Sequence, residues 1–134
     1  MDYDLLFFCK EIDSKYLLEI ANKKYLINYD YDVMDFSEQG VVCINLSDRI
    51  AFVSIIDGGL VFYSGLRESL IGVEALENDF LVVSDMSLFF VNKKYFFPWG
   101  YKTFPDSLVT YKLLNNLEID LEYATDGKKI LKLI

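Results

Sequence analysis

The sequence predicts a mainly β protein, an antiparallel meander of about a dozen short strands in repeats of about 35 residues, resembling an open, partial propeller. Three observations predict this fold: the composition, the even spacing of turn residues, and the apolar runs beside each turn. Of 134 residues, 53% are hydrophobic and 16% are aromatic. Aromatic and β-branched residues favour strands, and so apolar a chain is not expected to be disordered. We expect residues 1–134 to form a single domain.

Four turn-like segments recur at nearly constant spacing. Asn, Asp and Gly tolerate the positive φ of tight hairpin turns. The first residues of the segments are 35, 35 and 34 positions apart. The segments are Asn22-Lys23-Lys24, Asp57-Gly58-Gly59, Asn92-Lys93-Lys94 and Asp126-Gly127-Lys128. The spacing indicates either a structural repeat or an ordinary meander whose hairpins happen to be evenly spaced.

Apolar runs flank every turn segment and predict the strands. The runs before the turns are 17–20, 51–55, 88–91 and 117–121, and those after the turns are 25–27, 60–62, 95–97 and 130–131. Further runs lie upstream at 5–9, 41–45, 80–84 and 108–114. Between 117 and 123, apolar and acidic residues alternate with the period of a strand. Each repeat is therefore expected to hold about three strands.

The segment 66–77 fits a strand or a short helix. Leu66, Leu70, Val73 and Leu76 have helical spacing, whereas Gly72 weakens a helix. Propeller blades usually have four strands and about 40–45 residues, and several blades are needed to close a ring. We therefore expect an open array whose sheet edges must be covered, charged or used for binding.

The sequence offers little for catalysis, so we expect no enzyme activity and no cofactor. Histidine is absent, which excludes a Ser-His-Asp triad, a Cys-His pair and an imidazole metal ligand. Cys9 and Cys43 lie in apolar runs and are expected to be buried thiols, although they could pair in an oxidising compartment. The acidic stretch 30–41 does not match a calcium loop, because its sixth residue is Asp35 and its twelfth is Val41. No glycine-rich phosphate loop is present, and we expect no metal site.

Both the N-terminus and the uncharged runs predict a soluble, cytoplasmic protein that does not enter a membrane. The chain begins with Met1-Asp2-Tyr3-Asp4, where a signal peptide would carry basic residues. No uncharged run, such as 58–66, exceeds nine residues, and about 20 are needed to cross a bilayer. With 21 acidic and 13 basic residues, the chain is not expected to bind nucleic acid directly.

The negative charge is concentrated in the first two-thirds of the chain. Residues 1–92 carry a net charge of -10, and residues 93–134 carry +2. We select as candidate binding residues two acidic groups and the tryptophan of an aromatic block that contains Pro98. They are Tyr29, Asp30, Tyr31, Asp32, Asp35 and Glu38, then Glu74, Glu77 and Asp79, and finally Trp99. The alternative for the first acidic group is a solvated loop or strand end, and for the second a solvated turn or helix face. For most of the rings the alternative is core packing, with Pro98 placing the block at an edge or in a loop.

In size, acidity, lack of histidine and acid–tyrosine clusters such as 29–35, the chain resembles the immunity proteins of bacterial toxin systems, especially those of contact-dependent growth inhibition. The resemblance implies a protein that binds a cognate toxin domain, in many cases a basic nuclease, and blocks its active site. An acidic surface would speed the encounter with such a partner. The alternative is a β-rich interaction or scaffold module of a larger complex. The oligomeric state is left open by the sequence.

Overall fold

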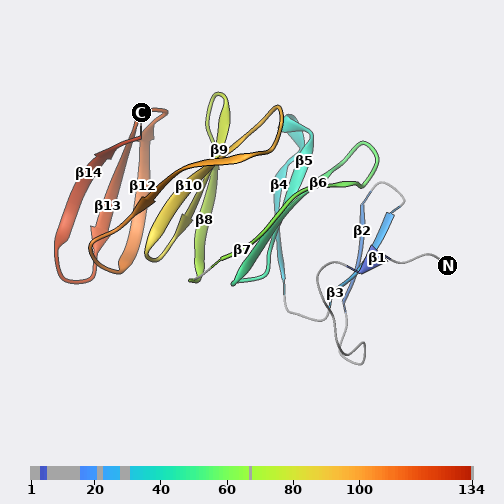
Figure 1. Ribbon diagram of the computed structural model, residues 1–134, viewed down its shortest axis with the longest axis horizontal. Coiled ribbons are helices and arrows are strands. Elements are labelled where there is room, and N and C mark those ends of the chain that lie inside the picture. The colour runs from blue at the N-terminus through green and yellow to red at the C-terminus, as the bar shows by residue number, and fades with distance from the viewer. Residues whose placement is uncertain (1–3, 6–15, 21–22, 28–30, 67, 134) are drawn as a thin grey trace. The chain divides into compact units, whose positions relative to one another are not determined.

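The computed structural model describes residues 4–5, 16–20, 23–27, 31–66 and 68–133 (Figure 1). In these residues, fourteen strands form four sheets, and one 3-10 turn, η1 (Ser37–Gln39), is present. The prediction of a mainly β chain is therefore confirmed. Internal contacts divide the chain into two compact units, Met1–Gly65 and Leu66–Ile134, and the expectation of a single domain stays a prediction.

The first sheet contains β1 (Asp4–Leu5), β2 (Tyr16–Ile20) and β3 (Lys23–Ile27) in the order β1-β3-β2. Strands β2 and β3 are antiparallel, as predicted for the two sides of the first turn segment, whereas β1 pairs with β3 in parallel. Asn22 and most of the apolar run 5–9, including Cys9, lie outside the described residues.

The second sheet is an antiparallel meander of β4 (Asp32–Phe36), β5 (Val41–Asn45), β6 (Arg49–Ser54) and β7 (Leu60–Gly65) in chain order. Its central strands β5 and β6 are buried on both faces, which explains why they consist of nearly continuous apolar residues. On one face Ile44, Ala51 and Val53 form a cluster. On the other face the Phe52 ring packs against Phe36 and Phe62, with centroids 6.5 and 5.9 Å away.

The third sheet repeats this order with β8 (Leu70–Ala75), β9 (Asp79–Ser84), β10 (Ser87–Asn92) and β11 (Pro98–Thr103). The segment 66–77, for which the sequence fits a strand or a short helix, contains strand β8. The prediction of a possible helix there is wrong. The helical spacing of the leucines misled because Gly72 serves the sheet. A Cβ on Gly72 would come within 2.1 Å of the Tyr111 hydroxyl oxygen, so only glycine lets this tyrosine cross the strand.

The fourth sheet contains β12 (Leu108–Asn115), β13 (Glu118–Tyr123) and β14 (Gly127–Lys132). The predicted alternation is confirmed in β13, where Ile119, Leu121 and Tyr123 are buried and the acids between them are partly exposed. These three side chains belong to a core formed with the β8–β11 sheet, to which that sheet contributes Leu81, Val83, Leu88 and Phe90. The β8–β11 and β12–β14 sheets thus share one hydrophobic core.

The repeat is structural, but its period is slightly longer than the spacing of the turn segments. The second, third and fourth sheets begin at Asp32, Leu70 and Leu108, which are evenly spaced, and we call this interval the sheet period. The same interval separates the first residue of each strand of the β4–β7 sheet from the first residue of the corresponding strand of the β8–β11 sheet. These two sheets have four strands each, one more than predicted.

The three turn segments that begin at Asp57, Asn92 and Asp126 lie in hairpins, but not at equivalent positions. The turn residues 55–57 correspond to 93–95, so Asp57 is equivalent to Tyr95 and not to Asn92. The segment at Asp126 lies in the hairpin between β13 and β14, one hairpin earlier in its sheet. The run 95–97 is part of a turn and not a strand, because β11 begins at Pro98.

A carboxylate–hydroxyl hydrogen bond also recurs after one sheet period. Ser87, the first residue of β10, donates to Glu68 Oε1 at 2.6 Å. The equivalent residues of the next repeat are Thr125 and Asp106, and the Thr125 hydroxyl donates to Asp106 Oδ2 at 2.5 Å. Each bond joins the segment before the first strand of a sheet to a residue near the start of the third strand. Ser87 is the first residue of that strand, and Thr125 lies in the turn before it. The residue equivalent to Glu68 in the preceding repeat is Asp30, which lies outside the described residues.

Candidate functional site

The turn between β10 and β11 is closed by hydrogen bonds to one asparagine. Asn92 Oδ1 accepts the N–H groups of Lys94 and Tyr95 at 2.9 and 2.8 Å, and the Asn92 carbonyl accepts the Phe96 N–H at 2.8 Å. The turn forces Phe96 to a φ of 56°, a left-handed conformation that costs a non-glycine residue about 1–2 kcal/mol. Its ring stacks on Phe80 at 6.4 Å, and this packing offsets part of that cost.

A β-bulge then divides the aromatic side chains of β11 between the two faces of the sheet. Between the Leu88/Lys102 and Phe90/Trp99 pairs, β11 has one residue more than β10. Gly100 in this bulge has a φ of 69°, and a Cβ there would lie 2.7 Å from Phe90 Cδ2. Without the extra residue, Trp99 and Tyr101 would lie on the same face.

The rings of Trp99 and Tyr101 instead stack on consecutive residues of β10. Trp99 lies on Phe90 at 4.6 Å and Tyr101 lies on Phe89 at 4.7 Å, both with nearly parallel ring planes. Because Phe89 and Phe90 point to opposite faces, β11 carries an aromatic ring on each side. Pro98 begins this strand, at the edge of its sheet, so the prediction that Pro98 marks an edge or loop is confirmed.

Trp99 is also fixed by a hydrogen bond. Its indole N–H donates to Asp79 Oδ1 at 2.8 Å, across the intervening strand β10. Asp79 is only 8% exposed, so this bond satisfies a carboxylate that is largely removed from water. Two candidates chosen independently from the sequence, Asp79 and Trp99, are therefore direct partners.

Lys93 binds the backbone just after β8 in the same region. Its ammonium group donates to the carbonyl oxygens of Leu76 and Glu77 and lies 5.6 Å from the centroid of the Phe80 ring. Burial lowers the pKa of Lys93, while the nearby charges of Asp79 and Glu77 act in the opposite direction. The turn is thereby attached to the neighbouring turn between β8 and β9.

Four aromatic side chains of this hairpin remain exposed, and we call them the aromatic edge. Tyr95 is 69% exposed, Phe97 48%, Trp99 37% and Tyr101 63%. Of these four residues, the sequence predicts only Trp99 as a binding residue. The signal for the others was the density of aromatic residues between 95 and 101, for which core packing was the main alternative.

The first acidic group does not form a single site in the described residues. Tyr29 and Asp30 lie outside them. Tyr31 is partly buried and packs against the Ile44 cluster. Asp32, Asp35 and Glu38 are exposed on β4 and in η1, with β4 at the edge of its sheet.

Asp35 stabilises the local backbone in addition to being exposed. Its Oδ1 accepts the Ser37 N–H at 2.8 Å, and hydrogen bonding to Ser37 lowers the pKa of the Asp35 carboxyl. This is a turn-capping interaction at the start of η1.

The second acidic group is divided among three roles. Glu74 accepts a hydrogen bond from the Tyr111 hydroxyl at 2.9 Å and so joins β8 to β12. Burial, followed by the charge of Glu74, raises the pKa of Tyr111. Glu77 is exposed in the turn between β8 and β9, and Asp79 binds Trp99 as described above.

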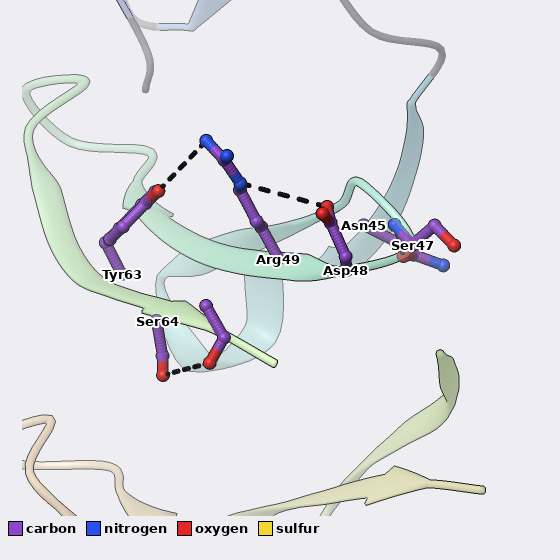
Figure 2. Close-up of polar contacts among 7 residues, drawn as sticks. Asn45, Ser47, Asp48, Arg49, Tyr63 and Ser64 are labelled. Carbon is purple, nitrogen blue, oxygen red and sulfur yellow. Dashed lines mark hydrogen bonds and ion pairs between the residues drawn. The ribbon is translucent and has the colours of Figure 1, made fainter. Parts of the chain in front are cut away.

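The β4–β7 sheet carries a second exposed hairpin with different side chains. Ile56 is 86% exposed at the tip of the turn between β6 and β7. On β7, Tyr63 is equivalent to Tyr101, and its hydroxyl accepts a hydrogen bond from Arg49 Nη1 at 3.4 Å (Figure 2). The Arg49 Nε lies 3.8 Å from Asp48 Oδ1 in the preceding turn (Figure 2).

A hollow of about 260 Å³ lies on the β12–β14 sheet. Its lining residues are Thr110, Tyr111, Lys112, Asp120, Glu122 and Lys128. Lys112 is opposite Asp120 and Glu122 is opposite Lys128 in the strand register, so the charges nearly cancel. The hollow therefore has no strong preference for an anion or a cation.

The described residues contain no group of three or more Cys, Asp or Glu side chains arranged to hold a metal ion. Cys43 is fully buried, and burial raises the pKa of its thiol to about 12, so it stays protonated near neutral pH. Within the same residues, no helix is long and apolar enough to span a bilayer.

No protein-family model and no curated protein sequence matches this chain. Its structure is nevertheless similar to those of β-propellers. The β-propeller domain of Cps50 (Swd1) from Myceliophteria thermophila superposes with a TM-score of 0.65 at 7% identity, over 88% of this chain and 38% of that one. The WD40 β-propeller domain of Doa1 gives a TM-score of 0.57 at 15% identity, over 88% of this chain and 46% of that one.

A designed protein, Ika4, gives a TM-score of 0.62 at 8% identity, over 90% of this chain and 81% of its own. The chain has a β-propeller-like fold. The predicted fold class is thereby confirmed. The chain spans less than half the length of the two natural propeller domains.

Proposed function

We propose that this propeller-like chain is a protein-binding module and that the aromatic edge contacts its partner. The single observation that carries the proposal is that four aromatic side chains are exposed on one hairpin whose backbone is fixed by a bulge and by ring stacking. Exposed groups of large apolar side chains mark interaction sites, and tryptophan and tyrosine are enriched among the residues that dominate binding energy. The proposal rests on this site, because one fold serves many functions.

The module acts by binding, with no reaction of its own. Support for this part of the proposal comes from the absence of histidine and from the buried, protonated thiol of Cys43. A substrate turned over by the purified protein would contradict it.

Site-specific photo-crosslinking tests the proposed surface. A benzophenone amino acid at Tyr95 is expected to give a discrete crosslinked protein in cells of the source organism. The matched control is the same amino acid at Asn116, an exposed turn residue of the β12–β14 sheet. The purified partner should then bind the Phe97→Ser, Tyr101→Ser double variant at least about tenfold more weakly. Crosslinking at Asn116 alone, or unchanged affinity of the double variant, would remove the aromatic edge from the interface.

A second candidate function is neutralisation of a basic toxin domain through the acidic edge of the β4–β7 sheet. Asp32, Asp35 and Glu38, exposed on β4 and η1, favour it, as does the net negative charge of the first 92 residues. Charge complementarity acts mainly on the association rate and weakens as salt rises. An association rate that is independent of salt would argue against this candidate and for the aromatic edge.

A further inference from the structure

One side chain of the aromatic edge is fixed before any partner binds. Trp99 is stacked on Phe90 and donates its indole N–H to Asp79, and the bulge at Gly100 fixes the backbone beside it. A side chain that is already ordered loses little entropy when a partner arrives. We propose that the face of this indole opposite Phe90 is a docking site for an arginine side chain of the partner protein, an inference that rests on the proposed function.

The electrostatics of the indole favour a cation. One ring face is covered by Phe90, yet Trp99 keeps 37% of its surface exposed. Among the aromatic side chains, tryptophan has the strongest attraction for a cation over its face. Donation of the indole N–H to a carboxylate increases the electron density of the ring and therefore strengthens this attraction. Asp79 is too buried to pair directly with the incoming cation, so it acts through the ring.

The same hairpin already places cations over aromatic rings. Lys93 Nζ lies 5.6 Å from the centroid of Phe80, and Lys94 Nζ lies 5.2 Å from that of Tyr95. Both lysines are therefore directed to rings other than Trp99. The exposed Glu77 carboxylate, two residues before Asp79, favours a positively charged partner.

Arginine fits this site better than lysine. Its planar guanidinium can lie flat on an aromatic ring while its N–H groups remain available to a carboxylate such as Glu77. It is also more weakly hydrated than an ammonium group, so it loses less on leaving water. Arginine and tryptophan are both enriched among the residues that dominate binding energy near the centres of protein interfaces.

A library of short random peptides tests the inference. Peptides selected on the whole protein are expected to be enriched in arginine over lysine. Since the chain has one tryptophan, binding near Trp99 is read directly from tryptophan fluorescence. Replacing the arginine of a selected peptide with citrulline, which keeps the shape and removes the charge, is expected to weaken binding about twofold to fivefold.

One variant and a matched control test whether the Asp79 carboxylate strengthens the preference for arginine over citrulline. Asp79→Asn keeps a hydrogen-bond acceptor and removes the charge, so the ratio of arginine to citrulline affinity is expected to fall toward one. Tyr63→Phe, on the equivalent strand of the other four-stranded sheet, is the control and is expected to leave the ratio unchanged. The comparison of the two peptides on the unaltered protein needs no variant and stands even if Asp79→Asn does not fold.

The possible results separate the inference from the proposed function. Peptides that change Trp99 fluorescence but bind equally well with citrulline would overturn the arginine site and leave the aromatic edge as a protein-binding surface. A selection that gives no peptide dependent on Trp99 or its neighbours would overturn both.

Discussion

The β4–β7 and β8–β11 sheets have the same backbone plan and use it differently. In both, two backbone hydrogen bonds close the turn after the third strand, and they join equivalent residues. In the β4–β7 sheet Ser54 accepts the Gly58 N–H and donates to the Gly59 carbonyl, and in the β8–β11 sheet Asn92 accepts the Phe96 N–H and donates to the Phe97 carbonyl. The residue with positive φ is Gly58 in one turn and Phe96 in the other. The backbone geometry therefore repeats although the side chains do not.

The largest difference is the ring that the fourth strand supplies. In the β4–β7 sheet, Phe62 is buried against Phe52. At the equivalent position of the other sheet stands Gly100, and the ring that contacts Phe90 comes from Trp99, which remains partly exposed. Where the β4–β7 sheet buries the Phe62 ring, the β8–β11 sheet has a glycine, and the ring of the neighbouring Trp99 is partly exposed.

The largest effect is expected from Gly100→Ala. The alanine would have to keep a φ of 69°, and its Cβ would lie 2.7 Å from Phe90 Cδ2. We therefore expect a loss of about 2–4 kcal/mol in the free energy of unfolding. Gly127→Ala is the control: it has a φ of 74° but no heavy atom within 4 Å, and should lose only about 1–2 kcal/mol. Urea denaturation measures both, and equal losses would show that Phe90 moves aside.

Gly72→Ala is expected to cost about 1–3 kcal/mol, because its Cβ would overlap the Tyr111 hydroxyl. The equivalent residue of the β4–β7 sheet is Met34, so glycine is required here by the tyrosine and not by the strand. Combining Gly72→Ala with Tyr111→Phe should therefore cost less than the sum of the two single changes. Additive losses in urea denaturation would contradict this explanation.

The turn residues provide a test of smaller effects. Gly58→Ala should cost about 1–2 kcal/mol, because alanine is strained at a φ of 73°. Phe96→Gly relieves the same strain and loses the contact with Phe80, so the two effects should leave the stability within about 1 kcal/mol of the original. If Phe96→Gly were as damaging as removal of a fully buried ring, about 3–5 kcal/mol, the ring would matter more than the turn.

Much of this fold could be predicted from the sequence. Strands with continuous apolar residues, such as β5 and β9, and the alternating strand β13 follow directly from side-chain patterns. The sheet period was missed because hairpins with different turn residues have the same geometry, so matching residue types aligned Asp57 with Asn92 in place of Tyr95. The leucine spacing around β8 resembles that of a helix. The reason for a glycine at position 72 is the contact with Tyr111, which belongs to another sheet and cannot be recognised from the local sequence.

The candidate site was less predictable. The acids and Trp99 were visible as residue types, but the Asp79–Trp99 hydrogen bond joins strands that are far apart in the sequence. The exposure of Tyr95, Phe97 and Tyr101 depends on a bulge and on a turn with a positive φ at phenylalanine. Neither feature follows from hydrophobicity, because an aromatic block has the same composition whether it is buried or exposed.

The link between Asp106 and Thr125 predicts a dependence of stability on acid. Hydrogen bonds from the hydroxyl and N–H of Thr125, the largest causes, and from Ser107 and Asp126 lower the pKa of Asp106 to about 2. Since the carboxyl of an unfolded chain titrates near 3.9, this contribution is present above about pH 4 and is lost as the pH falls toward 2. Melting temperatures measured across this range should fall less steeply for Asp106→Asn than for the original chain. Parallel curves would show that Asp106 contributes nothing to the acid sensitivity.

The smallest effect on stability is expected from the acidic edge of the β4–β7 sheet. Asp32 and Glu38 are exposed, so replacing both with lysine should change the free energy of unfolding by no more than about 0.5 kcal/mol for each. The same variant separates the two functional candidates, because it reverses the charge of this edge and leaves the aromatic edge intact. A partner held through the acidic edge should associate more slowly with the variant, and the difference should shrink as salt is added. Association rates measured at low and high salt that are identical for the two proteins would remove the acidic edge from the interface.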